Sequence, residues 1–280
     1  MKRSTKWIIG IVVILVIVVA GYFSFARKSA TSSQTVTVGI MSGTSKDDKV
    51  WNEVAKIAKD KYKLNVKYKK FTDYTQPNKA VANGDVDIDA FQHYDFLDDW
   101  NKSNKGNLVP IGQTFITPIR VYSKKVKSLN DLKTGATIAV PNDATNESRA
   151  LFVLKNAGLI TFKPGTTQAT VSSIAKNPKK IKIKELDASQ TARALSDVDA
   201  AVINTNFAQT AGLNYKSAIY VEPLNKDSKK WINIVAAEKK DKNKKAYKEY
   251  VKAFQTKKVK NLIHKEYGNA ELAAWDLKFK

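Results

Sequence analysis

The sequence predicts an α/β fold with largely parallel sheets, because segments of strand character alternate with segments of helical periodicity along most of the chain. Alternating apolar residues predict the first strand at 36–40. The next segment places Val50 and Val54 on one helical face, and Ser45 with Asp48 resembles a capping box at its start. The same signals predict strands at 66–71, 137–140 and 200–203, and helices at 148–157 and 244–263.

The most informative segment is 77–93, which predicts a short helix, a turn at Gly84 and an alternating strand. This strand delivers Phe91, Gln92 and His93 together at its carboxyl end. Ligands bind beyond the carboxyl ends of strands in α/β sheets. The segment therefore indicates a small-molecule site.

The composition and motifs exclude several classes of protein. There is no cysteine, so disulfides, thiolate catalysis and a lipid anchor on cysteine are excluded. No nucleophile elbow or phosphate loop is present, and two histidines cannot form a multi-histidine metal site, so we expect no enzyme, cofactor or metal. Asp85, Asp87 and Asp89 lack the pattern of a calcium loop and are interpreted as a polar strand edge or as capping groups.

The formal net charge is +22, and the lysines are spread over helices and loops rather than gathered in one stripe. This distribution argues against a nucleic-acid partner. A basic exterior also suits an anionic cell wall, which remains a hypothesis.

The N-terminal region 1–35 predicts a membrane anchor and a tether. Trp7 to Phe25 is an uncharged, mostly apolar run long enough to span a bilayer as one helix. The basic residues before it favour a body on the extracytoplasmic side of the cell membrane. The alternative is a signal peptide cleaved after Ala26, which would leave a secreted protein.

Two apolar stretches, 114–122 and 231–236, look like crossings between lobes. They divide the body into a discontinuous lobe, 36–116 plus 234–280, and an inserted lobe, 117–233, with hinge crossings at both ends. Clefts between domains are preferred ligand sites.

Polar residues follow strands on both sides of this predicted cleft. Arg149 lies in the first turn of a helix and could bind a carboxylate, or it could be an ordinary surface arginine. Asn204 and Asn233 suit a zwitterion, since amides both donate and accept, but asparagines also cap loops.

Read together, four segments carry a resemblance to the methionine-binding lipoprotein (MetQ/NlpA) family of ABC-importer substrate-binding proteins. The resemblance covers the chain from about Val36 to the C-terminus. The segments are FTDYTQPNKAVANGDVDIDAFQH (71–93), TFITPIRVYSKKVKSLNDL (114–132), VPNDATNESRALFVLKNAGLI (140–160) and AVINTNFA (201–208).

The resemblance implies a two-lobed periplasmic-binding-protein-like fold of type II, which we expect to follow one N-terminal transmembrane helix. It implies a protein that binds methionine or a related amino acid between the lobes and delivers it to an ABC permease and its ATPase. We expect a monomer. The alternatives are another apolar amino acid, a methionine-containing dipeptide, or a basic cell-surface adhesin.

The family motifs also imply which residues bind the ligand. Tyr74 and Phe91 match aromatic positions around the ligand side chain, and His93 matches a pocket histidine. The remaining matches are Asn146, Arg149, Asn204 and Asn233, which would hold the amino-acid end. The sequence departs from the family in lacking the lipid-anchor cysteine and in having Thr117 and Trp231 where tyrosines are usual.

Overall fold

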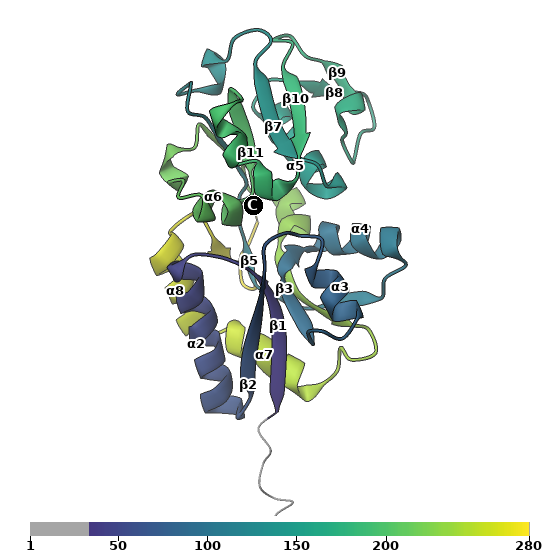
Figure 1. The fold of residues 1–280 in the computed structure, drawn as a ribbon, viewed down its shortest axis with the longest axis vertical. Helices are drawn as coiled ribbons and strands as arrows, with labels where there is room; N and C mark the ends of the chain where they lie inside the picture. Colours follow the sequence, from purple (N-terminus) through teal and green to yellow (C-terminus); the bar gives the residue numbers. More distant parts are fainter. Residues whose placement is uncertain (1–33, 280) are drawn as a thin grey trace, which may run out of the picture. The chain divides into compact units, whose positions relative to one another are not determined.

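The computed structural model describes residues 34–279, and the predicted membrane segment Trp7–Phe25 lies outside these residues. Within 34–279, no helix combines the length and apolar character needed to cross a bilayer. Two five-stranded sheets organise this region, one drawn around β1 and one around β7 in Figure 1. The predicted α/β class is confirmed.

The first sheet has the strand order β2-β1-β3-β13-β4. Its strands β2, β1 and β3 are parallel, whereas β13 runs antiparallel to both β3 and β4. The strands are β1 (Thr35–Met41), β2 (Asn65–Phe71), β3 (Ile88–His93), β4 (Leu108–Gln113) and β13 (Asn233–Glu238), and the helices around them are α2 (Ser45–Tyr62), α3 (Pro77–Ala82), α4 (Tyr94–Asn104), α7 (Lys245–Phe254) and α8 (Lys257–Tyr267).

The second sheet has the order β10-β7-β11-β6-β12, in which β10, β7 and β11 are parallel and β6 runs antiparallel to β11 and β12. Its strands are β6 (Arg120–Tyr122), β7 (Thr137–Pro141), β10 (Lys182–Leu186), β11 (Ala200–Ile203) and β12 (Tyr220–Val221), with the helices α5 (Ala144–Asn156) and α6 (Thr205–Thr210). Two small sheets pair β14 (Leu272–Ala273) with β5 (Phe115–Ile116), and β8 (Thr161–Phe162) with β9 (Ile174–Lys176).

Each large sheet contributes to its own apolar core. Val38 and Ile40 of β1 pack with Tyr250 and Phe254 of α7 and with residues of α2 and α8. In the second sheet, β7 and α5 share a core that includes Ile138, Leu151 and Leu154. Burial of each such side chain stabilises the fold by about 1.5–3 kcal/mol, and this packing fixes the strands whose ends border the site.

Three local predictions need correction. Helix α2 is capped by Thr44 with Asp47 rather than by Ser45, so the capping box lies one residue earlier. Helix α5 begins four residues before position 148 because Asp143 caps it. The predicted helix 244–263 is two helices, since Thr256 accepts from Val259 N and starts α8.

The acidic motif before the site also differs from its prediction. Asp89 is 0% exposed rather than part of a polar strand edge, because β3 is a central strand between β1 and β13. Its Oδ1 accepts from Gln92 Nε2 at 2.9 Å. Gly84 does form the predicted turn, with a positive φ of 79° that favours glycine.

Candidate functional site

A cavity of about 70 Å³, measured at the centres of water-sized spheres, lies at the carboxyl ends of strands from both large sheets. Since one water needs about 10–15 Å³ by this measure, the cavity has room for a small organic molecule. All seven residues predicted as ligand contacts border it. They are Tyr74, Phe91, His93, Asn146, Arg149, Asn204 and Asn233.

Aromatic rings form one side of the cavity. The Tyr74 ring centroid lies 6.0 Å from that of Phe91 and 5.9 Å from that of Phe96. Phe91 and Phe96 meet edge to face at 5.7 Å. His93 in turn packs edge to face on Trp231, at 5.0 Å. Such a wall suits an apolar or thioether group.

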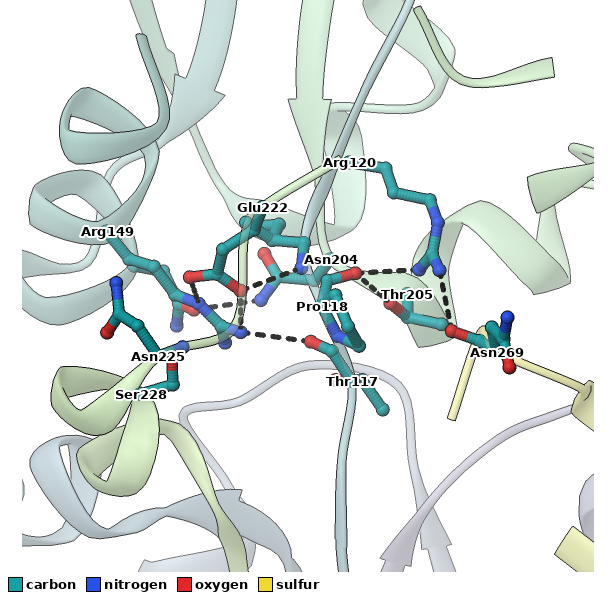
Figure 2. A network of polar contacts seen from close by, with 12 residues as sticks. Thr117, Pro118, Arg120, Arg149, Asn204, Thr205, Glu222, Asn225, Ser228 and Asn269 are labelled. Carbon is teal, nitrogen blue, oxygen red and sulfur yellow. Dashed lines mark hydrogen bonds and ion pairs between the residues drawn. The ribbon is translucent and has the colours of Figure 1, made fainter. Parts of the chain in front are cut away.

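Arg149, which is 2% exposed, forms a buried ion pair with Glu222. Its Nε donates to Glu222 Oε1 at 2.8 Å, its Nη2 donates to Oε2, and the same Nη2 donates to the Thr117 carbonyl at 3.0 Å (Figure 2). Glu222 Oε2 also accepts from Ile119 N at 3.1 Å. These bonds fix the guanidinium at the cavity edge. Its Nη1 has no hydrogen-bond acceptor among residues 34–279, so it remains a free donor.

A chain of amides runs from the start of α5 to the cavity. Asp143 accepts from the Asn146 side-chain Nδ2 with both carboxylate oxygens, at 3.0 and 3.1 Å. Asn146 Oδ1 then accepts from Asn204 Nδ2 at 2.8 Å. Burial raises the pKa of Asp143, while the hydrogen bonds from Asn146 act in the opposite direction. At the end of this chain, Asn204 Oδ1 is buried without a partner in the part of the chain that the structure describes.

His93 caps α4 and is neutral in this environment. Its Nδ1 accepts from Phe96 N at 3.0 Å, so in the neutral ring the proton resides on Nε2. Burial and the nearby Arg149 charge lower the pKa of His93 to about 3, and the Asn146 amide opposes this shift. Nε2–H is buried and has no partner within residues 34–279, so it is an available donor.

Tyr74 and Asn206 place one more donor at the cavity. The Tyr74 hydroxyl donates to Asn206 Oδ1 at 2.5 Å, and Asn206 Nδ2 is left buried and unpartnered among the described residues. Asn233 occupies the first position of β13, opposite His93 in the strand register. Donors, an acceptor and a cation therefore meet an aromatic wall, which is the complement of an amino acid with an apolar side chain.

Comparison with known proteins identifies the family. A family model described as NlpA lipoprotein matches residues 36–275. The chain belongs to the NlpA lipoprotein family. The resemblance predicted from the sequence motifs is thereby confirmed.

Several NlpA relatives and solved structures are close to this chain. The probable D-methionine-binding lipoprotein MetQ of Haemophilus influenzae is 41% identical over 251 residues, covering 89% of this chain and 90% of the relative. A nutrient-binding protein from Burkholderia cenocepacia, solved bound to methionine, is 48% identical with a TM-score of 0.81, covering 85% of this chain and 99% of that one. The substrate-binding protein of a methionine transporter from Streptococcus pneumoniae is 43% identical with a TM-score of 0.82, covering 86% and 96%. The α/β fold of this chain therefore matches that of substrate-binding proteins of methionine transporters.

Several residues at this NlpA-family site were not predicted from the sequence, among them Phe96, Asn206, Glu222 and Asp47. Phe96 and Asn206 lie within three residues of predicted ones, so a wider reading of each motif would have found them. Glu222 has no local signal, because its partner Arg149 is distant in sequence. Asp47 does carry a local signal, since it forms the capping box with Thr44, but its second partner Tyr267 is distant. Within residues 34–279, no group of three or more histidine, aspartate or glutamate side chains is arranged to hold a metal ion.

Proposed function

We propose that this chain is the extracytoplasmic substrate-binding protein of an ABC importer and binds methionine or a closely related amino acid. The observation that carries the proposal is the pairing of an aromatic wall with buried, unpartnered polar atoms around a fixed arginine. A buried polar group without a partner costs about 1–3 kcal/mol, and a ligand that pairs with it recovers this free energy. The probable D-methionine-binding lipoprotein of Haemophilus influenzae and the methionine-bound protein from Burkholderia cenocepacia support the same ligand.

In this proposal the ligand carboxylate approaches Arg149 Nη1 and the donors His93 Nε2–H and Asn206 Nδ2. The ligand ammonium donates to Asn204 Oδ1, and the thioether packs on Phe91 and the rings beside it. Asn233 and Tyr74 complete the enclosure. These are binding roles, so the proposal assigns no catalytic step to any residue.

The cellular setting belongs to the same proposal. The body comprises two lobes, 36–116 plus 234–280 and 117–233, in a type II arrangement that closes on the ligand. An ABC permease and its ATPase receive the ligand. Because the sequence has no cysteine for a lipid, Trp7–Phe25 would hold the body at the outer face of the cell membrane, or would be cleaved to release it.

The test is calorimetric titration of the full-length chain in detergent, with a thermal-shift screen over amino acids and methionyl dipeptides. Methionine should raise the melting temperature, since a micromolar ligand at millimolar concentration stabilises by several kcal/mol. R149M should weaken methionine binding at least tenfold, whereas R193M, at an exposed arginine, should not. Absence of stabilisation by every compound in the wild-type screen would overturn the proposal.

A further inference from the structure

We propose that Asp143 is a positioning residue that sets which atom Asn204 presents to the ligand. Asp143 itself does not border the cavity, whereas Asn146 and Asn204 do. The inference rests on the proposed function, because it concerns the ammonium end of an amino-acid ligand. It assigns to Asp143 a share in ligand selectivity in addition to its capping of α5.

The argument begins with the hydrogen-bonding rule for a carboxylate, which only accepts when ionised. Both oxygens of Asp143 lie within 3.1 Å of Asn146 Nδ2. An Asn146 amide turned by 180° would place its oxygen against this carboxylate, acceptor against acceptor. Asp143 therefore holds the Asn146 nitrogen towards itself and the Asn146 oxygen away.

The next step fixes Asn204. With its orientation set, Asn146 offers only Oδ1 to its neighbour, so Asn204 must donate its Nδ2, as it does at 2.8 Å. Asn204 Oδ1 is left over, buried and without a protein partner in the described chain. Two amides thus transmit the acceptor character of one carboxylate to the cavity edge. An oxygen there favours an ammonium group and disfavours a carboxylate.

The variant D143N tests the idea while keeping the helix cap, because asparagine and aspartate are equally good caps. In D143N one of the two contacts to Asn146 becomes unfavourable whichever way the amide points, so neither orientation is enforced. Two ligands are titrated against the full-length chain: methionine and 4-(methylthio)butanoic acid, which lacks the amino group. D143N should weaken methionine binding about tenfold and change binding of the desamino acid less than about threefold, since only methionine uses the Asn204 acceptor.

A swap and a control complete the experiment. The double variant D143N/N146D moves the carboxylate from position 143 to position 146. Asn204 Nδ2 can then donate to the carboxylate at 146, so the affinity ratio of the two ligands should return towards the wild-type value. D187N changes the exposed aspartate that caps 188–190 and should leave the ratio unchanged. Equal weakening of both ligands by D143N, or no rescue by the swap, would overturn the positioning role. Failure of the wild type to bind methionine would instead overturn the proposed function.

Discussion

Removing the charge of Glu222 while keeping its shape tests how far the site depends on one buried ion pair. Arg149 and Glu222 are 2% and 7% exposed, and they meet through two parallel hydrogen bonds. Breaking a buried pair by removing one partner typically costs 3–5 kcal/mol, because the other charge is left uncompensated. We take the lower end, about 3 kcal/mol, for E222Q, because a glutamine keeps one acceptor and Arg149 keeps the Thr117 carbonyl.

The assay is thermal unfolding of the full-length chain, monitored by calorimetry. In a protein of this size each kcal/mol lowers the melting temperature by about 2–4 °C, so E222Q should melt about 6–12 °C below wild type. The control is E266Q, because Glu266, whose side chain is 10% exposed, pairs at 3.0 Å with Lys49, whose side chain is 58% exposed and stays solvated. Such a pair contributes at most about 1 kcal/mol. Melting of E222Q within 2 °C of E266Q would refute the reasoning.

Three other predictions concern His93, Asp89 and Gly112. The pKa of His93 is lowered to about 3, so protonation of this residue in the unfolded chain should reduce folding stability as the pH falls from about 6.5 to about 3. In urea unfolding, H93Q should lose this part of the acid dependence, whereas H264Q, at an exposed histidine, should keep it. Burial raises the pKa of Asp89 to about 8, so ionisation of Asp89 in the unfolded chain should lower the free energy of unfolding as the pH rises from about 4 to about 8. The stability of D89N relative to wild type should therefore increase between pH 5 and pH 8, and parallel pH profiles of the two proteins would contradict this. A Cβ at Gly112 would lie 2.4 Å from a methyl of Val251, so G112A should cost about 1–3 kcal/mol in chemical unfolding, and adding V251A should recover part of it.

Much of the fold could be predicted because its signals are local. The run 77–93 gave a helix, a glycine turn and a strand, and these are α3, the turn at Gly84 and β3. The break between α7 and α8 was missed, because Tyr250 and Phe254 before it and Val259 and Ile263 after it all face one core. A continuous apolar pattern cannot reveal that Thr256 starts a new helix.

The seven residues predicted as ligand contacts border one cavity, but the hydrogen bonds that hold them in place could not be predicted. Each ligand candidate lies in a motif that can be read locally, whereas the groups that orient Arg149 come from far along the chain. Glu222 is 73 positions from Arg149, and Thr117 is 32 positions away. Single-sequence patterns carry no information on such pairings, which depend on how distant segments of the chain come together in the fold.

The segment 117–120 shows why a side chain at the cavity can change without moving the Arg149 guanidinium. Arg149 is held by the carbonyl of Thr117, and the Pro118 carbonyl accepts from Arg120 Nη1 at 2.7 Å and from Thr205 Oγ1 (Figure 2). Arg120 also donates to the Asn269 carbonyl at 3.0 Å, so the segment is fixed through its backbone. The Thr117 residue nevertheless borders the cavity. A different side chain at 117 would therefore reshape the cavity while the carbonyl that orients Arg149 stays in place. Under the proposed function, the choice of ligand side chain is thus separate from binding of the ligand carboxylate.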